Sequence, residues 1–532
     1  MSVLRSQLDP RTPAAQAARE SMLGRLAELD ELLEQVNGGG GPKYVERHRK
    51  RGKLLPRERI ELLIDRDAPF LELQPFMAQH ADFHVGASNV TGVGVVEGVE
   101  CVLGASDPTV RGGTSNPYTL CKTMRAQEIA LVNRLPLINL VESGGADLPT
   151  QAEIFVPGGA IFRNLTRLSA RGIPTVSLVF GNSTAGGAYL PGMSDYNVFV
   201  KGGAKVFLGG PPLVKMATGE ESGDEELGGA EMHARTSGLA DYLAVDERDA
   251  LRLGREIVAG LNWGKLGPAP APDPPGPLHD PEDLLSLVPP DPKVPFDPLE
   301  VLARILDGSR YDEFKPLYGT SLSTGWGSIH GYPVGVLANV RGILFSEESE
   351  KAAQFIQLAN QKNTSLIFLH NTTGFMVGRE YEQGGIIKDG AKMINAVSNS
   401  TVPHLSVIIG GSYGAANYAM SGRAYDPRFV FAWPNAQISV MGPAQLAGVL
   451  SIVARAGAQA RGVPYDEQAD KAMRTAVEAQ IEAEQTALSN SSRGYDDAII
   501  DPRDTRTALG FALSVAHNAP VRGAEAFGVF RM

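Results

Sequence analysis

The chain of 532 residues contains the same unit twice, and this internal repeat limits its possible folds more than any other feature. Residues 56–65 match residues 298–307, and the glycine-rich run 181–189 matches 410–418 at an offset of 229. Other matches between these points have offsets of 229 to 242. A repeat of this length indicates a duplicated domain and not a short-period solenoid.

Both copies alternate apolar, strand-like runs with helical stretches. Residues 173–180 and 402–409 are apolar, rich in β-branched residues and closed by glycines, which is typical of buried strands. The alternation predicts an α/β fold in which each copy has a largely parallel sheet covered by helices. The length also exceeds what one hydrophobic core usually serves, so we expect two domains.

The domain organisation follows from shifts in composition. We expect an N-terminal helical extension (1–44), the first copy (45–266), a proline-rich linker (267–293) and the second copy (294–532). The extension holds an amphipathic helix over residues 13–36. Prolines make the linker stiff. The second copy carries a helical insertion at about 446–490, rich in alanine, glutamine and glutamate.

Composition and simple motifs exclude several classes of function. The net charge of −11 argues against nucleic acid or an anionic membrane as the main partner, and no apolar run approaches the roughly 18 residues of a membrane helix. There is no GxxxxGK[ST] loop, and the nine histidines show no metal-binding spacing, so we expect no P-loop and no metal site. Two cysteines and no secretory signal favour a cytoplasmic protein.

The two glycine-rich runs are the candidate sites. Each follows a predicted strand and places small residues, with bare backbone N–H groups, at the start of a helix. Such groups have no acceptor within the helix and favour an anion or a developing oxyanion. A short basic segment, residues 47–53, is a further candidate for ligand phosphates or a partner, although such clusters are usually a solvated face.

Residues 410–414 also satisfy the GxSxG pattern of a serine hydrolase, with Ser412 as the nucleophile. Such an enzyme needs a downstream histidine, and only His517 is available. The first copy has Ala185 where the closing glycine would stand. The run of small residues shared by both copies suits N–H donors better than a nucleophile.

Seven motifs, taken together, point to one family. They are Arg51-Gly-Lys53 with Pro56-Arg-Glu-Arg59, Ala185-Gly-Gly-Ala188, Gly209-Gly-Pro-Pro-Leu-Val214, Gly374-Phe-Met-Val-Gly378, Tyr413-Gly-Ala-Ala-Asn-Tyr418, Trp433-Pro-Asn-Ala436 and Val440-Met-Gly442. The chain resembles the carboxyltransferase (beta) subunits of biotin-dependent acyl-CoA carboxylases over nearly its whole length after about residue 45. The resemblance implies two crotonase-like (ClpP/crotonase) domains of ββα repeats, a homo-hexamer built as a trimer of dimers, and an active site between domains of opposite subunits.

The resemblance also implies roles for residues in both runs. The N–H groups of Gly186 and Gly187 would hold the thioester oxygen of an acyl-CoA, and those of Ala415 and Ala416 the ureido oxygen of biotin, because negative charge develops on both oxygens. The other binding residues that it implies are Gly144, Gly145, Ala185, Gly374, Phe375, Gly414 and Tyr418. Biotin itself would take the proton, so no side-chain base is required.

Partner and substrate are implied in the same way. The Met-Lys-Met signature of a biotinylated lysine is absent, so a separate alpha subunit would supply biotin carboxylase and the biotin carrier. The segment 371–381 is most similar to 3-methylcrotonyl-CoA and geranyl-CoA carboxylases, whose substrates are branched and α,β-unsaturated. Tyr418 replaces the Asp of members acting on small saturated acyl-CoAs, whereas Ala416 departs from the glycine usual in this subgroup. A saturated acyl-CoA substrate, a decarboxylase that reverses the transfer, and a hexamer with only an architectural role are the alternatives.

Overall fold

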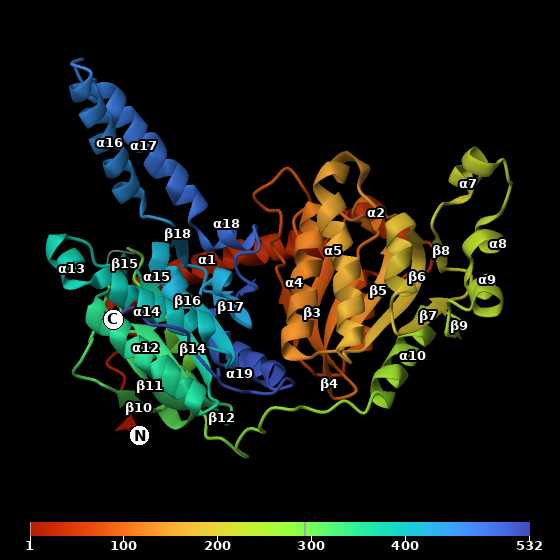
Figure 1. Cartoon of the computed structure of the whole chain (residues 1–532). Coiled ribbons are helices and arrows are strands. Elements are labelled where there is room, and N and C mark those ends of the chain that lie inside the picture. Colours follow the sequence, from red (N-terminus) through yellow and green to blue (C-terminus); the bar gives the residue numbers. More distant parts are fainter. Residues whose placement is uncertain (1, 292–293) are drawn as a thin grey trace. The chain divides into compact units, whose positions relative to one another are not determined.

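The chain forms two compact units in a computed structural model that describes residues 2–291 and 294–532 (Figure 1). The N-terminal unit comprises Asp30–Leu266 together with His517–Ala519. The C-terminal unit comprises Gly267–Ala516, the first 29 residues and Pro520–Met532. Each unit is a mixed α/β structure built on one large sheet, as the alternating pattern in the sequence predicts.

The sheet of the N-terminal unit has the order β2-β3-β4-β5-β6-β7-β9, with β8 also paired to β6. Its strands are β2 (Phe70–Leu73), β3 (Asn89–Val96), β4 (Val99–Ser106), β5 (Leu137–Ser143), β6 (Thr175–Thr184), β7 (Tyr196–Val200), β8 (Lys205–Phe207) and β9 (Tyr242–Ala244). Its helices include α2 (Pro42–Arg49), α3 (Pro56–Leu63), α4 (Pro117–Asn133), α5 (Gln151–Ala170), α6 (Tyr189–Gly192), α7 (Pro211–Thr218), α8 (Asp224–Gly228), α9 (Ala230–Met232) and α10 (Glu247–Gly260). The strands β2, β3 and β4 pair antiparallel, and all later pairs in the sheet are parallel.

The sheet of the C-terminal unit repeats this order as β10-β11-β12-β14-β16-β17-β19, with β18 paired to β16 and β1 added at one edge. Its strands are β1 (Ser2–Val3), β10 (Arg310–Phe314), β11 (Leu322–Ile329), β12 (Tyr332–Asn339), β14 (Ser365–Thr372), β16 (His404–Tyr413), β17 (Phe429–Ala432), β18 (Gln437–Ser439) and β19 (Ala498–Ile499), and a separate pair is β13 (Ile343–Leu344) with β15 (Gly374–Phe375). Its helices include α11 (Leu299–Ile305), α12 (Ser346–Gln361), α13 (Arg379–Gly384), α14 (Ile386–Asn399), α15 (Gly414–Ala419), α18 (Ala487–Ser491) and α19 (Thr505–Ala516). The same switch from antiparallel to parallel pairing occurs after β12.

The hairpin between β3 and β4 shows why the repeated sequence folds in this way. Glu97 and Gly98 both have positive φ angles, 49° and 74°, as a tight two-residue turn requires. The carboxylate of Asp65 accepts hydrogen bonds from their N–H groups at 2.8 and 2.7 Å, and Arg255 pairs with Asp65 at 2.9 Å. These contacts tie the helix end, the hairpin and α10 together.

The hairpin between β11 and β12 reproduces this arrangement. His330 and Gly331 have φ angles of 48° and 80°, and their N–H groups donate to the Asp307 carboxylate at 3.0 and 2.8 Å. Arg506 of α19 pairs with Asp307 at 2.7 Å. The duplication therefore extends to individual side chains, which accounts for the match between residues 56–65 and 298–307.

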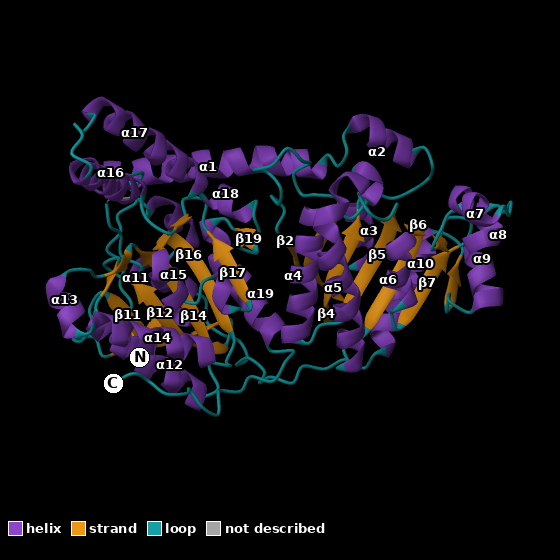
Figure 2. Cartoon of the chain, turned by 45° about the horizontal axis from the view of Figure 1, so that its top comes forward, coloured by secondary structure: helices purple, strands orange, loops and turns teal. Residues whose placement is uncertain are grey.

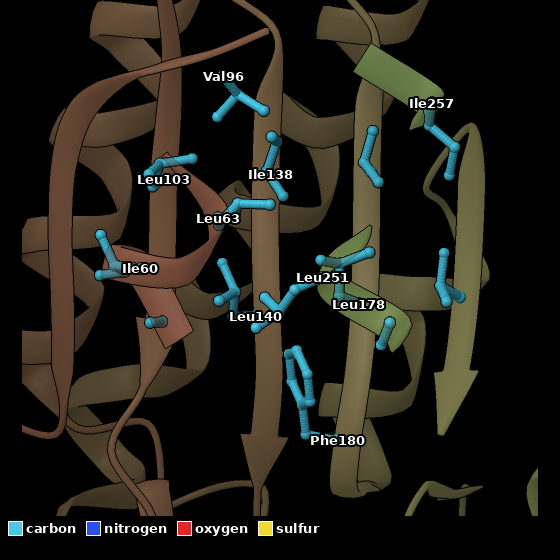
Figure 3. Packing of buried hydrophobic residues seen from close by; sticks show 14 of the residues in the cluster. Ile60, Leu63, Val96, Leu103, Ile138, Leu140, Leu178, Phe180, Leu251 and Ile257 are labelled. Carbon is cyan, nitrogen blue, oxygen red and sulfur yellow. The ribbon is translucent and has the colours of Figure 1, made fainter. Parts of the chain in front are cut away.

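The core of the N-terminal unit lies between the sheet and the helices α3 and α10 (Figure 3). Ile60 and Leu63 from α3 and Leu251 from α10 pack against Leu140 and Leu178 of the central strands. Burying one such side chain stabilises the fold by about 1.5–3 kcal/mol. The packed helices hold the central strands in place, and the loops that follow those strands carry the candidate site.

The helical insertion of the C-terminal unit is a long hairpin of α16 (Pro443–Ala460) and α17 (Glu467–Glu484), which stands out from its sheet (Figures 1 and 2). The helix α1 (Pro13–Asn37) forms where expected, but its apolar stripe is only partly covered: Met22 is buried and Leu23 is exposed. The proline-rich segment is more than a spacer, because Leu284 and Leu285 are buried. Pro292 and Lys293, at its end, lie outside the described residues.

Candidate active site

The first glycine-rich run, Gly181–Tyr189 (the N-terminal turn), connects β6 to α6. As the strand ends, Ala185 takes a left-handed φ of 54° and begins the 3₁₀ turn Ala185–Ala188. Gly186 is exposed and Gly187 is half-buried. Their N–H groups lie at the start of the turn, where the helix offers no acceptor. The turn therefore presents two neighbouring backbone donors.

A serine and a glycine hold the N-terminal turn in position. The buried Ser183 hydroxyl donates to the carbonyl oxygen of Gly187 at 2.8 Å and so spans the turn. Gly145 has a φ of 99°, and a Cβ there would lie 2.9 Å from the carbonyl oxygen of Thr184. Only glycine allows this close approach. Gly145 therefore lies against the turn, whereas its chain neighbour Gly144 is exposed and lies near Thr114.

The second run, Gly410–Tyr418 (the C-terminal turn), connects β16 to α15. Gly414 has a φ of 53°, the conformation that Ala185 has in the first turn. Ala415 is exposed, whereas Ala416 is completely buried and its methyl group belongs to the core. Of the two donors expected in this turn, only Ala415 presents surface.

Ser412 does not have the surroundings of a nucleophile. Its hydroxyl is fully buried and lies 2.9 Å from Nδ1 of His370, and it accepts a hydrogen bond from Nδ2 of Asn417 at 2.8 Å. His370 is buried as well, and this burial lowers its pKa to about 4. A serine and a histidine enclosed in the core cannot attack a substrate, so the geometry argues against the hydrolase alternative.

The remaining predicted residues of the C-terminal unit lie around the C-terminal turn. The strand β15 contacts α15, and it places Gly374 (φ 139°) and Phe375 beside the turn. The Phe375 ring packs on Gly390 of α14. Tyr418 stacks on Tyr425 with ring centroids 5.6 Å apart and remains 42% exposed. Tyr418 therefore has one packing face and one face that is free for a ligand.

A cavity of about 620 Å³ opens in the N-terminal unit beside the N-terminal turn. Its lining includes four cationic side chains, those of Arg47, Arg51, Lys53 and Arg111. The predicted Gly144 is also part of the wall. Part of the basic segment at residues 47–53 therefore lines a cavity, while Arg49 and Lys50 are exposed and do not.

A buried charge network closes one side of this cavity. The Glu142 carboxylate pairs with Lys53 and, at 2.7 Å, with Arg59, which also pairs with Glu247 at 2.8 Å. The Arg59 guanidinium lies 4.3 Å from the ring centroid of Phe180. Burial alone would raise the pKa of Glu142, but the charges of Arg59 and Lys53 hold that pKa below its usual range. The glutamate is thus a fixed anion that orients Lys53.

Among the lining residues of the cavity that sequence reasoning missed are Arg111, Glu142 and Asn182. Arg111 follows β4, Glu142 stands near the end of β5, and Asn182 near the end of β6. Ligands of α/β proteins bind at the carboxyl ends of parallel strands. This rule, applied to the ends of these three strands, could have identified the three residues from the sequence.

Neither a metal centre nor a membrane span is found in the part of the chain that the structure describes. No three or more His, Cys, Asp or Glu side chains among residues 2–291 and 294–532 form a group suited to a metal ion. Within the same ranges, no helix has the length and the apolar character needed to cross a bilayer.

Comparison with known proteins agrees with this geometry. The model of the carboxyl transferase domain matches residues 47–530. The chain is 67% identical over 530 residues to a probable biotin-dependent acyl-coenzyme A carboxylase beta2 subunit of Mycobacterium tuberculosis, and all of both chains is covered. It is 49% identical over 514 residues to the beta1 subunit of the biotin-dependent 3-methylcrotonyl-coenzyme A carboxylase of the same organism, covering 95% of this chain and 96% of that one.

The fold has an equally extensive counterpart among solved structures. The beta subunit of P. aeruginosa geranyl-CoA carboxylase superposes with a TM-score of 0.91 at 46% identity, and 100% of each chain is covered. The expected crotonase-like carboxyltransferase fold is thereby confirmed. Because the family model spans most of the chain and the identities are high over its full length, this chain belongs to the carboxyl transferase family, among the beta subunits of biotin-dependent acyl-CoA carboxylases.

Proposed function

We propose that the chain transfers the carboxyl group of carboxybiotin to a branched or α,β-unsaturated acyl-CoA of the 3-methylcrotonyl-CoA type. The observation that supports this most strongly is the pair of matched turns. Ala185 and Gly414 share a φ within one degree, 54° and 53°, and each precedes an exposed residue with a bare N–H group, Gly186 and Ala415. Two oxygens gain negative charge in this reaction, and each turn provides a donor for one of them.

The N-terminal turn is assigned to the acyl-CoA. In this proposal Gly186 and Gly187 donate to the thioester oxygen, while Gly144, Gly145 and Ala185 shape the wall around it. The neighbouring cavity supports the assignment because its volume suits a ligand of this size and its arginines suit phosphate groups. Arg47 and Arg51 have no ion pair among the described residues, so both are free to bind an anionic ligand.

The C-terminal turn is assigned to biotin. A fused ureido ring needs neutral donors and an apolar wall, and the turn offers the exposed Ala415 with Gly414, Gly374 and Phe375 beside it. Carboxybiotin, when bound, supplies carbon dioxide and the base that accepts the substrate proton. The chain's part is to donate the Ala415 N–H to the ureido oxygen and to exclude water. Ala416 fills the core beneath the turn instead of contacting the ligand.

Tyr418 is the residue proposed to select the acyl chain. Its exposed face is apolar and rigid because the other face stacks on Tyr425. A flat, unsaturated acyl group gains from such a face, whereas a small saturated group leaves it uncovered. The relatives named for 3-methylcrotonyl-CoA and geranyl-CoA support the same class of substrate.

The proposed setting of the reaction is the cytoplasm. There the chain would assemble into a hexamer and work with an alpha subunit that supplies biotin carboxylase and the biotin carrier. The names of the relatives, beta subunits of biotin-dependent carboxylases, support such a partner. Neither nucleic acid nor a membrane is proposed as a partner.

The test is carboxylation of a panel of acyl-CoAs by the purified chain mixed with the alpha subunit encoded beside it. Preference for 3-methylcrotonyl- or geranyl-CoA over propionyl- and acetyl-CoA is expected, and Tyr418→Asp should shift that preference toward the saturated chains. Preference of the wild-type protein for saturated chains would overturn the substrate class but leave the turns with their roles. If no acyl-CoA of the panel is carboxylated although the hexamer is intact, a decarboxylase or an architectural role is favoured.

A further inference from the structure

The buried Ser412 and His370 and the half-buried Asn417 form a network beneath the C-terminal turn, and the N-terminal turn has no equivalent of it. The positions that correspond to His370 and Asn417, at the offset of 229, are Val141 and Ala188. Only the serine is shared: Ser183 in the first turn bonds to backbone. The second turn is therefore supported by side chains that the duplication alone does not explain.

Two hydrogen bonds join the three side chains of this network. The Asn417 amide donates to the Ser412 oxygen at 2.8 Å, and the same oxygen lies 2.9 Å from Nδ1 of His370. The imidazole of His370 is neutral, and Nδ1 is the ring nitrogen that faces Ser412. Burial favours this neutral form by lowering the pKa of His370.

Two residues of the network flank the segment that contains the N–H donor of Ala415. Ser412 and Asn417 stand on either side of Tyr413–Ala416, and their hydrogen bond closes this segment into a ring. A Cβ at position 422 would lie 1.9 Å from Oδ1 of Asn417, so Gly422 leaves the space that the amide occupies. The bond therefore restrains the direction in which the N–H group of Ala415 points.

We infer that Asn417, held by Ser412 and His370, is a positioning residue for the N–H group of Ala415, and that it acts on the biotin half of the reaction alone. The inference rests on the proposed function. Asn417 touches no reacting atom in this scheme; it sets the angle of a donor that does. Misplacing a reacting group by about 1 Å can cost on the order of 100-fold in rate.

The test uses the full-length chain in two assays. One is carboxylation of the acyl-CoA with the alpha subunit; the other is carboxyl transfer from the carboxylated acyl-CoA to free biotin. We expect Asn417→Ala to lower kcat by roughly 10- to 100-fold in both assays. It should also raise KM for free biotin several-fold and leave KM for the acyl-CoA unchanged. Asn417→Ser, which keeps a short donor, and Ser412→Thr, which keeps the hydroxyl, should retain more activity than Asn417→Ala and Ser412→Ala.

A matched control is available in the same unit. Asn360 is buried, and its Nδ2 donates to the Ser400 hydroxyl at 2.7 Å, nearly the length of the bond from Asn417 to Ser412. Asn360→Ala should lower the melting temperature without separating the two KM values. This control distinguishes a positioning role from a general loss of stability.

The possible outcomes distinguish failure of the positioning role from failure of the proposed function. If Asn417→Ala raises both KM values together, leaves kcat unchanged, or behaves as Asn360→Ala does, the positioning role is overturned and the proposed function stands. If wild-type protein transfers no carboxyl group in either assay, both are overturned. If Asn417→Ala does not fold, the comparison of Asn417→Ser with wild type decides the question by the same KM pattern.

Discussion

In the N-terminal turn the serine at the strand end donates to the backbone carbonyl of Gly187, whereas its counterpart Ser412 binds two side chains. The supports beneath the strands differ in the same way. Glu142, paired with two cations, lies under the first turn, and the neutral Asn371 lies under the second, where it accepts from the N–H of Gly411 at 3.3 Å. One duplicated backbone thus has a charged setting in one copy and a neutral setting in the other, which fits the proposal that the two turns bind different ligands.

The largest predicted effect comes from adding bulk to either turn. A Cβ at Gly186 would be in ordinary contact, 3.5 Å from Phe162, so Gly186→Val should fold but lose about 100- to 1,000-fold in kcat because the donor is blocked. Ala415→Val should lose as much. Gly186→Ala and Ala415→Gly are the controls and should retain most activity. The measurements are the two assays described above, with acyl-CoA and with free biotin. If the valine variants are as active as the wild-type protein, the assignment of both turns is refuted.

The cationic cavity should distinguish the two turns next. Arg47→Ala combined with Arg51→Ala is expected to raise KM for acyl-CoA by about 10-fold, because two charge-assisted contacts with phosphate are lost. KM for free biotin should not change. Arg49→Ala is the matched control, since Arg49 pairs with Glu58 and does not line the cavity. If the double variant has unaltered acyl-CoA kinetics at low and at high salt, the phosphate groups of the acyl-CoA do not bind in this cavity.

Backbone strain tests whether the two turns are conformationally equivalent. Both Ala185 and Gly414 are left-handed, and the cost for an alanine in that region is about 1–2 kcal/mol. Gly414→Ala should therefore lower the melting temperature by a few degrees, also because its Cβ would lie 3.1 Å from the carbonyl oxygen of Val440. Ala185→Gly should leave the melting temperature equal or slightly higher. If Ala185→Gly lowers the melting temperature more than Gly414→Ala does, the first turn is not strained.

The smallest predicted effect is an acid dependence common to both copies. Burial opposes ionisation of Asp65 and Asp307, but hairpin N–H groups and an arginine hold the pKa of each below its usual range. Their stabilisation is therefore complete above the unfolded pKa of about 4 and is lost as pH falls through the lower folded pKa. Asp307→Asn should flatten the fall of melting temperature between pH 5 and pH 3 more than Asp65→Asn, because Asp307 is less exposed. If neither variant changes the fall of melting temperature between pH 5 and pH 3, the two carboxylates do not stabilise the fold in this way.

Some features of the fold were not apparent from the sequence. Lys122 and Lys351 occupy equivalent positions, and both are buried and donate to two backbone carbonyls each. Nothing in their local sequence distinguishes them from solvated lysines. Burial lowers the pKa of Lys122 to about 8. Such residues become apparent only when a hairpin and a helix from different parts of the chain pack together.

What the sequence determined by itself is local or repeated: the duplication, the alternating elements, and the two turns where strands meet runs of small residues. These follow from periodicity and from the conformational freedom of glycine, which act over a few residues. Tertiary structure alone decided that Ser412 faces His370, that Ala416 fills the core, and that Arg59 joins Glu142 to Glu247 across 83 and 188 positions. Such contacts depend on where the packed helices place distant strands, because burial and pairing are properties of the assembled core and not of any one segment.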